Sequence, residues 1–173
     1  MTTQGEKIYL DANFLISMAI GNHRDNASAQ KLLATILING YEMYISPLCI
    51  HEMWQVIKKY EDYHKGNRKL LRRVNKSIKK IGLKFIFEER NFSYKQVLNI
   101  LQTCTAKITS IKGLRIIPVE SDRISSALNF IKKYDLKPAD SLHLSVMEKY
   151  SISNIASGDG HFNRVDGINK MWF

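Results

Sequence analysis

Short apolar segments alternate with longer amphipathic ones along the chain, and this alternation restricts the fold more than any other feature of the sequence. We expect strands at residues 7–10, 41–45, 114–119, 154–156 and 171–173. We expect helices at residues 14–20, 27–38, 47–60, 68–81, 93–113, 122–134 and 138–150. Strands separated by helices form βαβ units, because a parallel pair needs a long crossover connection. The pattern therefore predicts an α/β fold with a central, mostly parallel sheet flanked by helices.

Residues 1–173 are expected to form a single domain, because this length suits one globular unit with room for one elaboration. Proline and glycine are too few for a flexible linker, and the 45% hydrophobic content supports a proper core. We place the elaboration at about residues 60–92, as a helical insertion that carries a basic helix. Residues 84–87 within it fit either a short strand or a packed loop.

The sequence also indicates the cellular compartment of the protein. No apolar run approaches the roughly 20 residues that a membrane-spanning helix needs. The opening segment, residues 1–7, is polar and lacks the apolar region of a signal peptide. Cys49 and Cys104 each lie within an apolar helical stretch, so we expect two reduced core thiols. These features predict a soluble, cytoplasmic protein without a membrane partner.

Four acidic residues stand out by their positions. Asp11 directly follows the first predicted strand and Asp159 directly follows the fourth, and open α/β sheets bind ligands at these carboxyl ends. Asp140 falls on the apolar stripe of its helix together with His143, where an acid is costly unless it is paired or binds a metal. Glu52 lies at the edge of the apolar face of its helix.

Taken singly, each acid has an ordinary structural explanation. Asp11 could cap a helix, Asp140 could favour a helix N-terminus, Asp159 could form an Asx turn, and Glu52 could be a solvated surface acid. The joint pattern favours a metal site, because Mg²⁺ and Mn²⁺ prefer carboxylate oxygens. Two such ions about 3.5–4 Å apart can clamp the attacking and leaving oxygens of a phosphodiester.

The same acids lie in four segments that resemble the motifs of the PIN-domain family. The first is Leu10-Asp11-Ala12-Asn13, and the second is the serine-led helix from Ser46 to Glu52. The third runs from Lys137 to Leu144, and the fourth from Ser157 to Phe162 with Gly167-Ile168 downstream. The motifs occur in the family's order and span nearly the whole chain. No single motif is specific, but the third and fourth together are fairly specific.

The resemblance implies a PIN-like fold and an endoribonuclease that hydrolyses RNA phosphodiester bonds with Mg²⁺ or Mn²⁺. It implies that the metal is held, and water activated, by Asp11, Glu52, Asp140 and Asp159. It also implies that these acids are oriented by Asn13 and Ser157. Small members resemble VapC-type toxins, so an antitoxin partner and a homodimer are further implied expectations. The family's fourth motif often carries a second acid, and this chain has Gly160-His161 there, one ligand fewer.

Other functions remain open at this stage. A PIN nuclease that processes RNA without being a toxin fits the same motifs, as does a catalytically inactive PIN-like RNA-binding module. The intact acids argue against the inactive module, since phosphate binding alone would not favour a cluster of carboxylates. A phosphotransferase of the haloacid dehalogenase type would carry a second Asp where this chain has Asn13. His143 is expected to be a hydrogen-bonded core residue, and the role of His161 is left open.

The helix predicted at residues 68–81 is the strongest feature outside the acids. The whole chain carries a net charge of +10, which favours an anionic partner. On a helical wheel, one arc of roughly 140° holds only basic residues. These residues are Arg68, Lys69, Arg72, Arg73, Lys76, Lys79 and Lys80. We interpret this face as an RNA-binding surface, with a solvated basic face or a dock for an acidic antitoxin as the alternatives.

Overall fold

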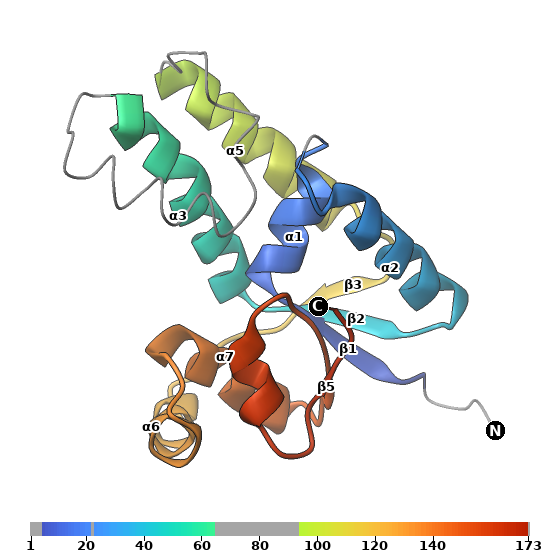
Figure 1. Ribbon diagram of the computed structural model, residues 1–173, viewed down its shortest axis with the longest axis vertical. Coiled ribbons are helices and arrows are strands. Elements are labelled where there is room, and N and C mark those ends of the chain that lie inside the picture. Colours follow the sequence, from blue (N-terminus) through green and yellow to red (C-terminus); the bar gives the residue numbers. More distant parts are fainter. Residues whose placement is uncertain (1–4, 22, 65–93, 173) are drawn as a thin grey trace.

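The computed structural model describes residues 5–21, 23–64 and 94–172, and its centre is a five-stranded parallel sheet (Figure 1). The strand order is β3-β2-β1-β4-β5, and all four neighbouring pairs are parallel. The strands are β1 (Lys7–Leu10), β2 (Glu42–Ile45), β3 (Leu114–Ile116), β4 (Asn154–Ala156) and β5 (Asn169–Lys170). The predicted α/β class and parallel sheet are therefore confirmed.

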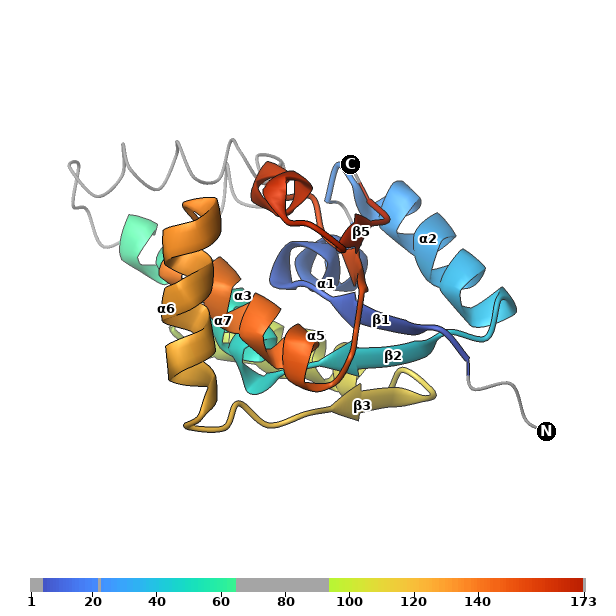
Figure 2. The same cartoon turned by 90° about the horizontal axis from the view of Figure 1, so that it is seen from below.

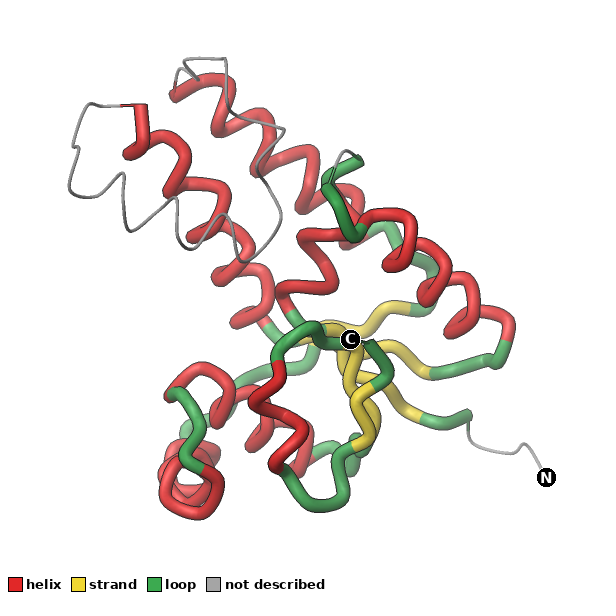
Figure 3. The backbone as a smooth tube through the Cα atoms, viewed as in Figure 1, coloured by secondary structure: helices red, strands yellow, loops and turns green. Residues whose placement is uncertain are grey.

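Helices cover the sheet on both sides, as Figures 1 and 2 show. The helices are α1 (Ala12–Ala19), α2 (Asn26–Ile38), α3 (Pro47–His64), α5 (Tyr94–Thr109), α6 (Arg123–Tyr134) and α7 (Pro138–Lys149), and a 3₁₀ helix, η1, spans Gly160–Arg164. Helices α1, α2, α3 and α5 gather on one side of the sheet, with α3 and α5 side by side. Helices α6 and α7 pack against each other on the other side. The tube in Figure 3 shows how short the strands are beside these helices.

Apart from the last strand, two helix ends and one strand end lie clearly away from their predicted positions, whereas the other ends differ only slightly. Helix α3 continues to His64 instead of ending near residue 60. Helix α5 ends at Thr109, before the predicted end near Gly113, because the chain turns between them and Gly113 adopts a φ of 82°. Strand β3 ends at Ile116, and the backbone N–H of Ile117 makes the next hydrogen bond to Ile45 before the chain leaves the sheet.

The last strand, predicted at residues 171–173, is placed wrongly, because Met171 and Trp172 lie outside it; Phe173 is not among the described residues. The strand lies at Asn169–Lys170, where Asn169 N–H donates to Ser153 and Met171 N–H donates to Ile155. The apolar residues at this position, which suggested a strand, are apolar because they pack in the core. Trp172 is buried and meets the ring of Phe14 edge-on, with ring centroids 5.4 Å apart. Apolar character there reflects packing against α1 rather than strand pairing.

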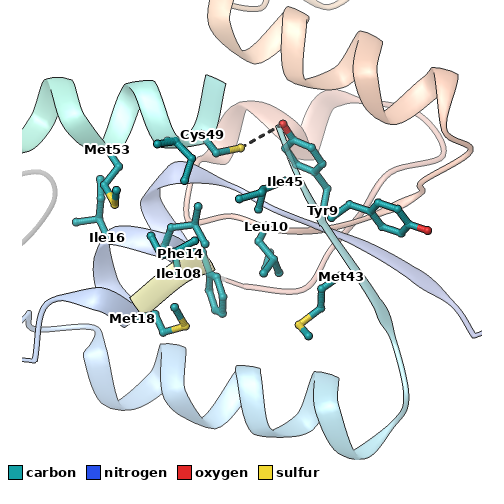
Figure 4. Close-up of a cluster of buried hydrophobic side chains, with 14 of the residues drawn as sticks. Tyr9, Leu10, Phe14, Ile16, Met18, Met43, Ile45, Cys49, Met53 and Ile108 are labelled. Carbon is teal, nitrogen blue, oxygen red and sulfur yellow. Dashed lines mark hydrogen bonds between the residues drawn. The ribbon is translucent and has the colours of Figure 1, made fainter. Parts of the chain in front are cut away.

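The main core lies between the sheet and helices α1, α2, α3 and α5 (Figure 4). The β1 residues Ile8, Tyr9 and Leu10 are wholly buried, as expected for a central strand covered on both faces. Cys49 and Cys104 are both buried free thiols, which confirms their predicted core role. Among the described residues, no helix is long and apolar enough to cross a bilayer.

Most of the predicted insertion lies outside the described residues. The segment 65–93 is not described, and it contains the predicted basic helix at residues 68–81, the uncertain segment 84–87 and the first residue of the helix predicted at 93–113. The described part of the 60–92 range belongs to α3, which ends at His64. The basic helix therefore stays a prediction.

Candidate metal-binding active site

Strands β1 and β4 pair in register so that the residues after them meet at one edge of the sheet. Leu10 pairs with Ala156, and the N–H of Asp11 donates to the Ala156 carbonyl at 3.1 Å. The Ser157 hydroxyl donates to Asp11 Oδ2 at 2.6 Å. The other oxygen, Oδ1, accepts the N–H of Ala12 at 2.7 Å and so caps α1. Asp11 is thus both a helix cap and a buried carboxylate at the ligand-binding end of the sheet.

Glu52 and His143 join Asp11 in a first group of polar side chains. Glu52 comes from α3 and His143 from α7, and one oxygen or nitrogen of each of the three residues lies within 4.8 Å of the others. His143 Nε2 is 3.1 Å from Glu52 Oε2, and its Nδ1 is 2.8 Å from the Tyr9 hydroxyl. His143 is buried and hydrogen-bonded, as the sequence predicts, but it also contacts a candidate ligand.

Asp140, Asp159 and His161 form a second group. Asp140 lies in the first turn of α7, and Asp159 caps η1 by accepting the N–H of His161 at 2.9 Å. The His161 ring nitrogen Nδ1 lies 3.1 Å from Asp140 Oδ2 and 3.1 Å from Asp159 Oδ1. Lys137 Nζ approaches Asp159 Oδ2 to 3.6 Å. The Asx turn considered for Asp159 therefore exists, and it places the carboxylate beside Asp140.

Ser157 connects the two groups. Its buried hydroxyl donates to Asp11 and accepts the backbone N–H of Asp159 at 3.0 Å. Ser157 is thus in contact with two of the candidate ligands, and its orienting role stays a prediction. Asn13, also predicted to orient the acids, is half-buried on α1, and its carbonyl accepts the Ser17 hydroxyl. Within the described residues the Asn13 side chain makes no hydrogen bond to the acids, so its role stays a prediction.

The four predicted acids thus fall into two adjoining groups, each completed by a histidine. Position along the chain pointed to the acids: Asp11 and Asp159 follow strands, and Asp140 opens a helix. Glu52 was indicated by its place at the edge of the apolar face of α3.

The two histidine contacts could not be predicted in the same way. His143 contacts Glu52 from 91 residues away, and His161 contacts Asp140 across 21 residues. The signal that exists for His143 is its place on the same helical stripe as Asp140.

The environment disfavours the charged forms of two of the acids. Burial raises the pKa of Asp11, and the Glu52 carboxylate adds to this, while His143 and the Ser157 hydrogen bond act in the opposite direction. Burial also raises the pKa of Asp140, and the Asp159 carboxylate raises it further, against the hydrogen bond from His161. A cation that binds between two such carboxylates reduces the repulsion between their charges and offsets the cost of burying them.

The donor set fits a divalent cation. Each group offers two carboxylates, and hard ions such as Mg²⁺ and Mn²⁺ prefer such oxygen ligands. Asp11 and Asp159 are held by hydrogen bonds to backbone N–H groups and Ser157, so these two candidate ligands are already oriented. The residues at this edge of the sheet are therefore compatible with a metal-binding active site.

Comparisons with known proteins identify the family of this chain. The family model described as PIN domain matches residues 8–168. Ribonuclease VapC6 of Methanocaldococcus jannaschii is 23% identical over 164 residues, which cover 93% of this chain and 94% of that protein. The match thus extends over nearly the full length of both.

Two solved structures share the fold. One is VapC20 of Mycobacterium tuberculosis, described as a sarcin-ricin loop cleaving toxin, with 16% identity, a TM-score of 0.55, and coverage of 90% of this chain and 92% of that one. The other is VapBC2 of Rickettsia felis bound to a DNA fragment from its promoter, with 12% identity, a TM-score of 0.58, and coverage of 96% and 98%. The PIN domain model matches the chain from β1 to the residue before β5, and the fold is that of VapC-type proteins. This chain therefore belongs to the PIN domain family.

Proposed function

We propose that this protein is a Mg²⁺- or Mn²⁺-dependent endoribonuclease that hydrolyses RNA phosphodiester bonds. The observation that carries the proposal is the pairing of Asp11 with Glu52 and of Asp140 with Asp159, linked by Ser157 at the carboxyl ends of β1 and β4. The relative named ribonuclease VapC6 and the neighbour described as a loop-cleaving toxin support RNA as the substrate class.

The chain's own residues would hold the cation and the reacting groups. Asp11, Glu52, Asp140 and Asp159 would supply the carboxylate ligands, and Ser157 would keep two of them in place. When bound, the cation would lower the pKa of a coordinated water and neutralise charge on the phosphate. The buried hydroxyl of Ser157 and the buried thiol of Cys49 are hydrogen-bonded inside the protein, which favours water as the nucleophile.

RNA binding would rest on the positive charge of the chain. The net charge of +10 attracts a phosphate backbone, and the basic helix predicted at residues 68–81 supplies seven of the cations. Arg68, Lys69, Arg72, Arg73, Lys76, Lys79 and Lys80 are the proposed RNA-binding residues. A docking face for an acidic protein is the alternative use of the same helix.

We further propose that the enzyme is the toxin of a toxin–antitoxin pair. The VapC-type relatives support this reading, and one chain of the VapBC2 structure is similar in fold to this chain. A PIN nuclease that processes RNA without a partner is the second candidate. Co-purification of this protein with the product of a neighbouring gene, followed by loss of cleavage in the complex, would favour the toxin. The homodimer is a prediction that light scattering would test.

A chelation experiment tests the proposed activity. The purified protein should cleave a long RNA with Mg²⁺ or Mn²⁺, lose this activity in EDTA, and regain it when excess metal is restored. A parallel preparation of Asp140→Asn serves as the control for contaminating nucleases. Undiminished cleavage in EDTA would contradict the metal requirement. RNA binding without cleavage in any of these metals would support the inactive RNA-binding module instead.

A further inference from the structure

A hydrogen-bonded chain runs from the centre of the sheet to Glu52. Tyr9 on β1 is wholly buried, and its hydroxyl lies 2.8 Å from Nδ1 of His143. The opposite ring nitrogen of His143, Nε2, lies 3.1 Å from Glu52 Oε2. The His143 side chain is 1% exposed, whereas that of Glu52 is 29% exposed. A buried tyrosine and histidine therefore hold a carboxylate that is itself open to solvent.

The surroundings of Tyr9 are compatible with its proton pointing at His143. Three polar atoms surround the hydroxyl: Ser46 Oγ at 2.6 Å, Cys49 Sγ at 3.2 Å and His143 Nδ1 at 2.8 Å. A hydroxyl donates once and accepts twice. The Cys49 thiol donates to it through the bond that Figure 4 marks with a dashed line, and the Ser46 hydroxyl can donate to the second acceptor position. The Tyr9 proton is then left for Nδ1 of His143.

This assignment fixes the histidine as a donor to Glu52. When Nδ1 accepts from Tyr9, the single proton of a neutral imidazole is on Nε2 and is donated to Glu52. The opposite tautomer would direct a lone pair at a carboxylate oxygen 3.1 Å away, which places two acceptors against each other. A doubly protonated ring would donate from Nε2 as well. Donation to Glu52 therefore does not depend on the charge of His143.

Glu52 needs such a support more than Asp11 and Asp159 do. Asp11 and Asp159 accept hydrogen bonds from backbone N–H groups next to them, which fixes their side chains locally. Glu52 has a longer side chain on the exposed edge of α3. Within the described residues, its hydrogen bond is the one from His143. Without that bond, the carboxylate would have to lose rotamer freedom each time a cation bound.

We propose that Tyr9 and His143 are positioning residues, which hold one oxygen of Glu52 and leave the other for the cation. This inference rests on the proposed function, since it assigns Glu52 to the metal. His143 is not a ligand in this arrangement, because a metal would require the Nε2 lone pair that the proton occupies. Tyr9 acts one step further back by setting the tautomer and the orientation of the ring.

A matched pair of variants tests the positioning role without RNA cleavage. His143→Gln can keep an N–H near the Nε2 position and so retain the donor to Glu52. His143→Asn reaches only the Nδ1 position, next to Tyr9, and loses that donor. Mn²⁺ affinity measured by electron paramagnetic resonance should fall about 10-fold or more in His143→Asn, the usual cost of removing an outer hydrogen bond from a metal ligand. His143→Gln should remain closer to wild type.

A second pair tests the role of Tyr9. Tyr9→Phe should weaken Mn²⁺ binding, because the ring of His143 loses the partner that sets its tautomer. Tyr44→Phe is the control, since Tyr44 is the β2 residue in register with Tyr9 and its hydroxyl binds Glu42 instead. Tyr44→Phe should bind Mn²⁺ as wild type does. Equal affinities in wild type, Tyr9→Phe and both His143 variants would overturn the inference.

The wild-type protein gives a test that needs no variant to fold. Nitrogen-15 spectra of the His143 ring should show a proton on Nε2, whether or not Nδ1 is protonated, and Mg²⁺ should leave that Nε2 proton in place. Loss of the Nε2 proton on Mg²⁺ addition would make His143 a ligand and overturn the positioning role. Failure of wild type to bind Mn²⁺ or Mg²⁺ at all would instead overturn the proposed function, and the positioning role with it.

Discussion

Asp140 lies where two unfavourable effects act on one carboxylate, namely burial and the neighbouring Asp159. Replacement by asparagine keeps the shape and removes the charge that a cation needs. We predict that Asp140→Asn lowers RNA cleavage at least about 10²-fold while the fold is retained, since the ion would stabilise charge in the transition state. Cleavage rates under single-turnover conditions, with circular dichroism as the folding control, would measure this. Wild-type rates in both Asp140→Asn and Asp11→Asn would mean that the site is misplaced.

Asp11 and Asp140 also make the stability of the metal-free protein depend on pH. Both have a pKa in the folded protein above the ordinary carboxyl value, so folding favours their protonated forms. Their contribution to stability is fully present below the unfolded pKa of about 4 and is lost as the pH rises through the folded pKa. Near neutral pH the Asp140→Asn variant should therefore melt at a higher temperature than wild type in EDTA.

Thermal melts of both proteins between neutral pH and about pH 4 measure this difference. The gap between Asp140→Asn and wild type should narrow as the pH falls, because protonated Asp140 and asparagine are both uncharged. A gap that stayed constant over this range would show that the charge of Asp140 does not destabilise the empty site.

At the scale of single residues, the sequence could indicate the acids but not their partners. Asp11 and Asp159 follow buried strands, and such positions converge at one edge of a parallel sheet. The contacts of His143 with Tyr9 and of His161 with Asp140 depend on how α7 and η1 pack in three dimensions. A single sequence carries no direct record of which distant side chains meet, so these contacts needed the structure.

Among the elements, the basic helix predicted at residues 68–81 offers a test that separates binding from catalysis. Reversing Arg72, Arg73 and Lys76 to Glu should weaken the binding of a long RNA. Each lost phosphate contact should reduce the magnitude of the slope of log affinity against log salt by about 0.7–0.9. Affinity measured at several salt concentrations in an Asp140→Asn background, which prevents cleavage, would give that slope.

The control is a second triple variant, in which three lysines outside the predicted basic helix are replaced by Glu. Its change in net charge is the same. Lys31, Lys95 and Lys112 are exposed residues on or next to α2 and α5, and their reversal to Glu should change the slope less. An equal effect of the two triple variants would mean that overall charge matters and that the helix has no special contact. An unchanged slope in both would favour an acidic protein partner for this face.

Most elements followed from local patterns in the chain. Strand β1 is an apolar run stopped by a helix cap, and α7 begins with a proline at its first position, so both were predicted closely. The last strand was placed wrongly because Met171 and Trp172 are apolar for packing reasons. Asn169 and Lys170 form a strand because they pair with β4. Their polar side chains do not predict a strand.

For the whole molecule, a bound cation should couple the active site to global stability. A ligand that binds only the folded state stabilises it by about 2.7 kcal/mol at 100 times its Kd. We predict that Mg²⁺ or Mn²⁺ raises the melting temperature of the wild type and raises that of Asp140→Asn less. Calorimetric melts with and without metal would show this. Equal shifts in the two proteins would indicate that the cation binds elsewhere.

The central claim is that the carboxylates of Asp11, Glu52, Asp140 and Asp159 hold the divalent cation. Anomalous diffraction from a crystal of the wild-type protein soaked in Mn²⁺ tests this most directly. We predict an anomalous peak in contact with carboxylate oxygens of these residues, at the carboxyl ends of β1 and β4. A peak confined to another part of the protein, or no peak at Mn²⁺ concentrations that support RNA cleavage, would contradict the claim.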